Sequence, residues 1–463
     1  MRRSAELKKY VPLAFHVALG GISPFVSSIT TIYGIIIIFY FLLLLIQSKN
    51  KTGEAHKAAV YIASMEIWFR MTGASLPWEF GKIAAIFFLT LGMFLERKRN
   101  YNWLYGGLLF LLLPSIILSA PPNLREFREA LTFQLGGMIL LVFALLYFSR
   151  RYLTLVQFVD LLRYALLPVV TILVHIIFRS PSISQIQFQL GANFAASGGY
   201  GPNQVSTILG LGVLITGFVY LWKLPPLISR RVDIILLALF ALRALLTFSR
   251  GGLVVAVFIL SFAYLIMLIN EKKLSIRRLM GFVLIGLTLA GTFFIVNRMT
   301  GDALFQRFRG DTYTTANQME EKTISKVTSG RADIVRTDIE MFLDYPIFGA
   351  GLGMSNQLRP SYGYNNISHI EQSRLLSEHG IFGLLILAIL IGLPFMRYFS
   401  RRGLNKSILL LFTVFSFLTM AHSATRLAIV GLYFGIGFIR IAIEKHSIHR
   451  QQTVETRLLT DQH

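Results

Sequence analysis

Long apolar stretches recur along almost the whole chain, and they constrain its fold more than any other feature. Each is long enough to cross a bilayer as a helix. They lie near residues 11–29, 31–47, 57–72, 81–95, 101–119, 130–148, 162–179, 203–222, 232–249, 251–269, 279–297, 380–397, 407–422 and 424–443. The first is weak and the thirteenth is short. The sequence therefore predicts an all-α, polytopic membrane protein with roughly 12–14 transmembrane helices.

The composition excludes several other classes of protein. Charged residues make up 15% of the chain and hydrophobic residues 54%, whereas soluble domains carry about 25% charged residues. The absence of cysteine excludes a disulfide scaffold, thiol catalysis and zinc–cysteine sites. We find no paired His/Asp/Glu pattern for a metal and no nucleotide-binding motif. We therefore expect neither a metal nor a cofactor.

The positive charge is distributed as a topology signal. The chain has 45 Lys+Arg against 23 Asp+Glu, and most of the basic residues form clusters between the apolar stretches. All these clusters fall on one side if the helices alternate, so we place that side and both termini in the cytoplasm. This arrangement disfavours a nucleic-acid partner. The predicted organisation is an N-terminal transmembrane bundle (1–297), an outer loop (298–379), C-terminal transmembrane helices (380–443) and a cytoplasmic tail (444–463).

The segment 298–379 is too long to be a simple connector, which suggests a functional role. It contains a predicted helix over about 329–343 that ends before Pro346. Such a helix lies on the membrane or roofs a cavity. Its predicted apolar stripe comprises Val335, Ile339, Phe342 and Leu343. The run Gly349-Ala-Gly351-Leu-Gly353 follows, and it either exposes backbone N–H groups to an anion or forms a flexible turn.

Two residues at the predicted outer surface are candidate catalytic groups. His369 lies shortly before a predicted span, and a histidine there can accept a proton from a sugar hydroxyl near neutral pH. Arg250 lies in a tight turn between two apolar helices, where its planar fork suits a diphosphate. The alternatives are a structural polar group for His369 and an anchor to lipid phosphate for Arg250.

Further polar residues at the same depth are candidate substrate ligands. Asn203 and Gln204 follow a glycine-rich stretch and either bind sugar hydroxyls or belong to a helix N-terminus. Glu371 and Arg374 form an i, i+3 pair if His369 opens a helix.

Three ordered motifs resemble those of the bacterial O-antigen ligase and O-antigen polymerase superfamily of polysaccharide-assembly glycosyltransferases. Two are short: Gly-Tyr-Gly-Pro-Asn203 opens a span, and Ser249-Arg250-Gly-Gly joins two spans. The third begins with Ser329-Gly-Arg331 and continues through the glycine run 349–353 to His369 and Leu375-Leu-Ser-Glu378-His-Gly380-Ile-Phe-Gly383. The order, the spacing and the long outer loop are similar to that family, most strongly over about 190–395.

The resemblance implies a multispan fold that transfers a saccharide from an undecaprenyl-diphosphate carrier at the outer face of the bacterial inner membrane. The acceptor is a lipid-linked glycan for a polymerase and a lipid-A core or another anchor for a ligase, with polysaccharide-assembly proteins as further partners. By position, His369 is similar to the catalytic histidine and Arg250 to the diphosphate-binding arginine. Arg331 or Arg179 is a candidate second arginine, because residues 193–197 lack one that many ligases have. With two or more arginines the reaction needs no metal.

A different class of function stays open at this stage. A transporter or flippase for lipid-linked sugars places charged residues near the bilayer midplane. Glu66 and Arg70, an i, i+4 pair in the third predicted span, are the main such residues; they form either a structural ion pair or part of an acceptor cavity. A scaffold for a polysaccharide-assembly complex is a third alternative, but it would not need Arg250 and His369 together.

Overall fold

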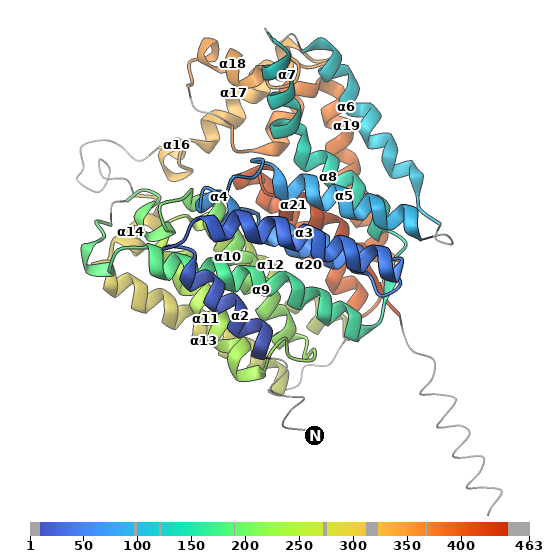
Figure 1. Ribbon diagram of the computed structural model, residues 1–463. Helices are drawn as coiled ribbons and strands as arrows, with labels where there is room; N and C mark the ends of the chain where they lie inside the picture. The colour runs from blue at the N-terminus through green and yellow to red at the C-terminus, as the bar shows by residue number, and fades with distance from the viewer. Residues whose placement is uncertain are drawn as a thin grey trace, which may run out of the picture.

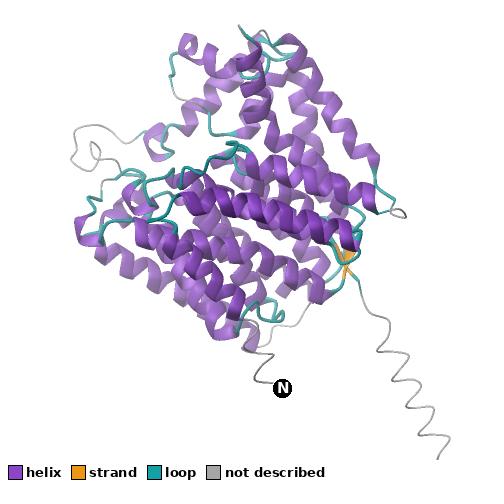
Figure 2. Ribbon diagram, in the orientation of Figure 1, coloured by secondary structure: helices purple, strands orange, loops and turns teal. Residues whose placement is uncertain are grey.

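Helices account for nearly all regular structure in the described part of the computed structural model (Figures 1 and 2). The structure describes residues 10–96, 100–119, 123–188, 190–271, 276–311, 323–365 and 368–442. The predicted tail 444–463 and several of the basic clusters lie outside these residues.

The helices before the long outer segment form most of the bundle. They are α2 (Tyr10–Ile22), α3 (Ser28–Ser48), α4 (Glu54–Met71), α5 (Phe80–Leu95), η1 (Trp103–Gly106), α6 (Gly107–Leu118), α7 (Leu124–Ala130), η2 (Leu131–Leu135), α8 (Gly136–Phe148), α9 (Leu155–Arg179), η3 (Ile183–Gln185), η4 (Ala195–Ser197), α10 (Pro202–Leu221), α11 (Arg230–Leu246), α12 (Arg250–Glu271) and α13 (Ile276–Met299).

The rest of the chain contributes the last helices and the segment 298–379, which was predicted to lie outside the cell and is called the outer segment below. The outer helices are α14 (Ala303–Arg309), α16 (Ile324–Val327), α17 (Arg331–Asp344), α18 (Met354–Leu358) and η5 (Arg359–Tyr362). They are followed by α19 (Glu371–Phe399), α20 (Leu404–Ser423) and α21 (Ala428–Ile436). The two strands in the described residues, β1 (Tyr152–Leu153) and β2 (Arg440–Ile441), form a short parallel pair.

The all-α membrane architecture predicted from the sequence is confirmed. Eight helices in the described residues are long and apolar enough to cross a membrane. They comprise α3, the α7–α8 segment, α9, α10, α12, α13, α19 and α20. The other predicted spans correspond to shorter or more polar helices, and the last is much shorter than expected, because α21 ends at Ile436 and the chain then enters β2.

The outer segment and the strand pair lie at opposite ends of the bundle. In Figure 1, α16, α17 and α18 lie toward the upper left and α14 lies at the left, at one end of helices such as α3 and α10. The strands β1 and β2, which begin at residues 152 and 440, pair with each other and lie at the other end (Figure 2). The segments predicted to lie outside the cell therefore gather at one end of the bundle.

Glycines bring α10 and α12 into close contact beside Arg250. A Cβ atom on Gly252 would lie 2.2 Å from the carbonyl oxygen of Ser206, and one on Gly251 would lie 2.4 Å from Cδ2 of His422. The Ser206 hydroxyl also donates to the carbonyl of Ser249 at 2.7 Å. The two glycines after Arg250 thus allow the start of α12 to lie directly against α10 and α20.

The buried face of α17 differs from the predicted apolar stripe. Ile334, Thr337, Asp338 and Met341 are buried, whereas Ile339 is 43% and Leu343 68% exposed. The predicted apolar stripe, which includes Ile339 and Leu343, is therefore not the side of α17 that packs on the protein, because a buried carboxylate occupies that side. Asp338 pairs with a buried arginine and accepts hydrogen bonds from serines of α19. The partners of Asp338 are Arg359, Ser373 and Ser377.

A break in α19 explains the glycine run that precedes it. Gly380 has φ 57° and ψ −135° inside the helix, so the carbonyls of Ser377 and Glu378 lose their helical donors. The backbone amides of Ala350 and Gly351 donate to these two carbonyls at 2.8 and 3.2 Å. The run is therefore neither an anion site nor a flexible turn. It is a close backbone junction, and α19 starts at Glu371, nine residues before the predicted span.

Candidate active site

Three arginines from separate elements meet at the N-terminal end of α12. The Arg250 guanidinium donates to the carbonyls of Arg307 and Val327, both at 2.9 Å. The Arg307 guanidinium donates to Ser329 Oγ at 3.3 Å, and Ser329 lies two residues before Arg331. No carboxylate among the described residues forms a salt bridge with any of the three arginines. We call Arg250, Arg307 and Arg331 the arginine cluster.

The arginine cluster has the electrostatics of an anion site. Burial, and then the charges of Arg250 and Arg331, lowers the pKa of Arg307 to about 10. Burial and the Arg250 charge also lower the pKa of Arg331, whose Nε is buried without a hydrogen-bond partner. Buried positive charges that lie close together repel one another, and a bound anion would offset this repulsion. A diphosphate has the charge and the oxygen acceptors to pair with such a cluster.

His369 lies within electrostatic reach of the arginine cluster. Burial, and then the charges of Arg426, Arg331 and Arg359, lowers the pKa of His369 to about 4. The charge of Arg331 therefore lowers the pKa of both Arg307 and His369. Arg307 also contacts Arg250 of α12, which lies more than 100 residues before His369 in the sequence. The imidazole is half-buried, and no hydrogen bond joins it to another described residue. It is neutral at pH 7 and free to accept a proton.

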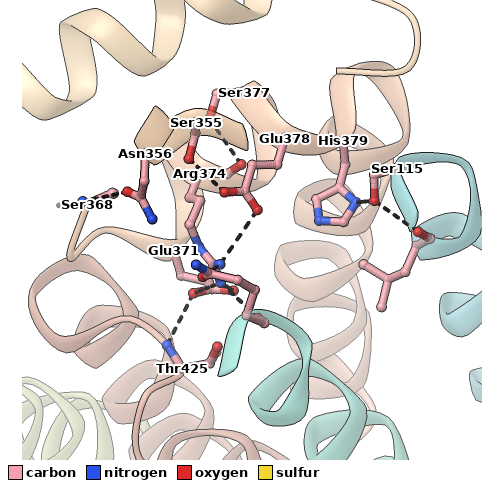
Figure 3. Close-up of polar contacts among 12 residues, drawn as sticks. Ser115, Ser355, Asn356, Ser368, Glu371, Arg374, Ser377, Glu378, His379 and Thr425 are labelled. Atoms are coloured by element: carbon pink, nitrogen blue, oxygen red, sulfur yellow. Dashed lines mark hydrogen bonds and ion pairs between the residues drawn. The ribbon is translucent and has the colours of Figure 1, made fainter. Parts of the chain in front are cut away.

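His369 lies two residues before α19 and does not open that helix. The backbone of the preceding residue, Ser368, is nevertheless held by two hydrogen bonds. The amide of Ser368 donates to Asn356 Oδ1 at 3.3 Å, a contact drawn in Figure 3, and the Ser368 carbonyl accepts from Arg426 Nη2 at 2.8 Å. These contacts fix the segment between α18 and the turn that joins α20 to α21.

Glu371 and Arg374 form part of a buried network, shown in Figure 3. The Arg374 guanidinium donates to both Glu371 oxygens at 2.7 and 2.8 Å and lies 3.6 Å from Glu378. Glu371 also accepts from the backbone amide of Thr425 at 3.2 Å, and Arg374 donates to the Gln134 carbonyl at 3.0 Å. With these partners, the pair joins α19 to the α20–α21 turn and to the start of α8. Both side chains are buried in this network, so the contacts that the structure shows for the pair are structural.

The other predicted ligands divide into two groups. Asn203 adjoins the arginine cluster, because its Oδ1 accepts from Ser249 Oγ at 2.7 Å. Gln204 turns toward Tyr200, whose hydroxyl donates to it at 3.1 Å, and toward Arg70 at 3.4 Å. Arg179 is exposed at the end of α9, and no described contact connects it to the arginine cluster. Of the two candidate second arginines, the structure places Arg331 beside Arg250.

Glu66 and Arg70 belong to a buried charge network next to the site. Arg70 pairs with Glu66 at 2.8 Å and with Glu79 at 3.3 Å, and Glu79 pairs with Lys82 at 2.6 Å. Arg70 also donates to the carbonyl of Arg426 at 3.1 Å. Glu66 and Arg70 line a cavity of about 110 Å³. The interpretation of the pair as an ion pair is therefore confirmed, and the acceptor cavity stays a prediction.

Three residues of this region were missed in the sequence. Arg307 is one of several arginines in the outer segment, and nothing in its spacing distinguished it. Arg426 lies near the start of the predicted span 424–443, and we took it as part of that span. His422, which contacts Thr207 Oγ1 at 3.2 Å and packs on Gly251, is a lone histidine in an apolar helix. The order Ser423-Ala-Thr-Arg426, polar residues inside an apolar stretch, was the available signal.

The lowered pKa of His369 predicts an unusual pH dependence. A histidine acting as a base must be neutral, and a pKa of about 4 keeps it neutral well below its ordinary value. We expect kcat/KM for transfer to stay constant down to about pH 5.5 and to fall as the pH approaches 4, since kcat/KM reports groups of the free enzyme. A half-maximal value near pH 6.5 would show that His369 is solvated or is not the base.

The fold and this site define a polytopic membrane protein with a cluster of three arginines and a half-buried histidine at one end of its bundle. Residues 235–388 match the model of the O-antigen ligase family, so the resemblance read from the sequence is confirmed over the segment that contains Arg250, Arg331 and His369. No curated protein shows significant similarity to the chain. The family match supports a membrane enzyme of glycan assembly.

Proposed function

We propose that the protein is a membrane glycosyltransferase that moves a saccharide from an undecaprenyl-diphosphate carrier onto a glycan acceptor. The observation that carries the proposal is the arginine cluster, which has no acidic partner among the described residues and adjoins a neutral histidine. The family match supports the same reaction class. The acceptor is a lipid-linked glycan in a polymerase and a lipid-A core in a ligase, and the site favours neither.

In the proposed reaction, an acceptor hydroxyl attacks the anomeric carbon of the donor. The bond from that carbon to the diphosphate oxygen breaks, and His369 takes the hydroxyl proton. Arg250, Arg307 and Arg331 stabilise the charge that develops on the departing lipid diphosphate. A single displacement of this kind inverts the configuration at the anomeric carbon.

The cavity beside Arg70 supports an acceptor path. It adjoins Trp78, which is 52% exposed and lies 6.4 Å from Tyr200 between ring centroids. Aromatic faces with neighbouring amide and hydroxyl groups are typical of saccharide sites. Arg70 connects this place to His369 through Arg426. We therefore place the acceptor on the α4–α5 side of His369 and the donor diphosphate on the α12 side.

An assay on the purified protein separates this proposal from a transporter or flippase. Incubation with an undecaprenyl-diphosphate-linked glycan and an acceptor is expected to release undecaprenyl diphosphate and to lengthen the acceptor, because the diphosphate is the leaving group. Protein inactivated by heat is the control. If reconstituted vesicles move the intact donor across the bilayer and release no diphosphate, the protein is a transporter.

The proposed orientation places the active site in the periplasm, and single cysteines test it. The chain has no cysteine of its own, and both Ser361 and Ser400 are exposed. We expect Ser361→Cys, but not Ser400→Cys, to react with an impermeant maleimide on intact spheroplasts, because basic clusters retain their loops in the cytoplasm. Permeabilised cells should label both. Labelling of residue 400 alone in intact spheroplasts would reverse the orientation.

A further inference from the structure

A second site lies at the end of the bundle opposite to the arginine cluster. A cavity of about 630 Å³ opens between α10, α12 and α13, and Tyr220, Tyr264 and Gly281 line it. Tyr220 comes 17 residues after Asn203 on α10, which is about 25 Å along a helix. Tyr264 comes 14 residues after Arg250 on α12, or about 21 Å. The cavity therefore belongs to the membrane face where the basic clusters gather.

The cavity has an apolar wall and a cationic end. Leu284, Leu287 and Met280 of α13 line the wall and are 45%, 64% and 64% exposed. Such exposure on a helix long and apolar enough to span a membrane means that the wall faces lipid chains. Lys223 and Arg230, from the connection between α10 and α11, line the other end. An acyl chain fits the first part and an anionic headgroup the second.

The two cations are placed to receive an anion. Lys223 is exposed, and the Arg230 guanidinium donates to the carbonyls of Val219, at 3.2 Å, and of Leu224, so it is fixed at the end of α10. The nearby carboxylate of Asp233 is held by the amides of Leu227 and Ile228. No carboxylate among the described residues forms a salt bridge with Lys223 or Arg230.

We propose that this cavity binds one anionic phospholipid from the leaflet on that face. The acyl chain lies along α13, and the phosphate lies between Lys223 and Arg230. Basic pockets between transmembrane helices at the cytoplasmic surface recognise anionic headgroups, and each cation contributes a several-fold preference. The bound lipid fills the space between α13 and the two helices, α10 and α12, that begin with Pro202 and Arg250. The site is separate from the proposed transfer reaction.

A cavity-filling substitution on α13 tests the proposal. Among the described residues, and apart from the neighbouring backbone of α13, a Cβ atom on Gly281 would have only Tyr220 Cε1 within 4 Å, at 3.8 Å, so Gly281→Phe should fold and occupy the cavity. Gly286→Phe is the matched control, because Gly286 lies on the same helix, is exposed, and has nothing within 4 Å of a Cβ atom. Lys223→Gln removes one cation without filling the cavity.

The measurement is native mass spectrometry of each purified variant after exchange into defined mixtures of phosphatidylglycerol and phosphatidylcholine. We expect the wild type and Gly286→Phe to retain one phosphatidylglycerol, Gly281→Phe to lose it, and Lys223→Gln to bind it about fivefold more weakly. Equal retention of the two lipids by the wild type would overturn the proposal. So would retention by Gly281→Phe equal to that of Gly286→Phe. If Gly281→Phe does not fold, the lipid preference of Lys223→Gln decides.

Discussion

Replacing His369 by alanine is expected to lower the rate of saccharide transfer by about 10²–10⁴-fold, the usual contribution of a general base. Binding of the lipid-linked donor should change little, because the imidazole acts on the acceptor hydroxyl in the transition state. The measurement is kcat and KM for release of undecaprenyl diphosphate, together with the affinity for the donor. His369→Gln can still orient a hydroxyl, so an equal loss in that variant would assign the effect to proton transfer.

The outer segment offers a control for this substitution. Ser361→Ala changes an exposed side chain whose only described hydrogen bond is to the nearby carbonyl of Leu358, at 2.6 Å. It should leave transfer unchanged. If His369→Ala keeps more than about a tenth of wild-type activity, a loss smaller than general-base catalysis contributes, the histidine is a structural polar group and another base must be sought.

Replacing Arg250 by alanine or by lysine is expected to lower transfer by about 10²–10³-fold, the cost of removing a preorganised group that stabilises the leaving charge. Lysine keeps the positive charge, but it lacks the planar fork with which two guanidinium nitrogens contact the carbonyls of Arg307 and Val327 and could still face a phosphate. The measurement is kcat/KM for the lipid-linked donor in protein that elutes as the wild type does. We expect donor affinity to fall as well, in contrast to His369→Ala.

Arg336 provides a matched arginine for this experiment. It lies on α17 with an exposed side chain that pairs with Glu340 on the same helix, so Arg336→Ala and Arg336→Lys should both transfer at the wild-type rate. Near wild-type activity in Arg250→Lys would reduce Arg250 to an anchor at the membrane surface. It would also leave Arg307 and Arg331 as the residues that bind the anion.

The sequence predicted the parts of the fold that depend on one segment at a time. Apolar length located the spans, and Pro346 correctly marked the end of α17. The sequence did not predict features that depend on a partner far away in the chain. The orientation of α17 depends on Asp338, whose partner Arg359 lies 21 residues away, and no local pattern shows that pairing. The start of α19 was misplaced because residues 371–379 are polar, yet their charges are buried in mutual contact.

The candidate site was predictable to a similar extent. The turn containing Arg250 and the segment containing His369 were chosen as candidates because each holds a residue of suitable chemistry next to a predicted span, and their roles stay predictions. Arg307 was not predicted, because the outer segment holds several arginines and this one is distinguished by its burial and by its hydrogen bonds to Phe248 and Ser329, which the sequence does not show. Arg426 was not, because its role depends on the carbonyl of Ser368, far away in the chain.

The junction between Gly380 and the preceding glycine run limits how the outer segment can be exchanged between proteins. The backbone of residues 346–351 supplies or accepts the hydrogen bonds of residues 377–381, and Gly349 and Gly380 have no room for side chains. A chimaera joined within 352–376 would therefore combine halves of two different junctions. Grafts of the outer segment between related proteins should therefore carry 346–381 as one unbroken unit.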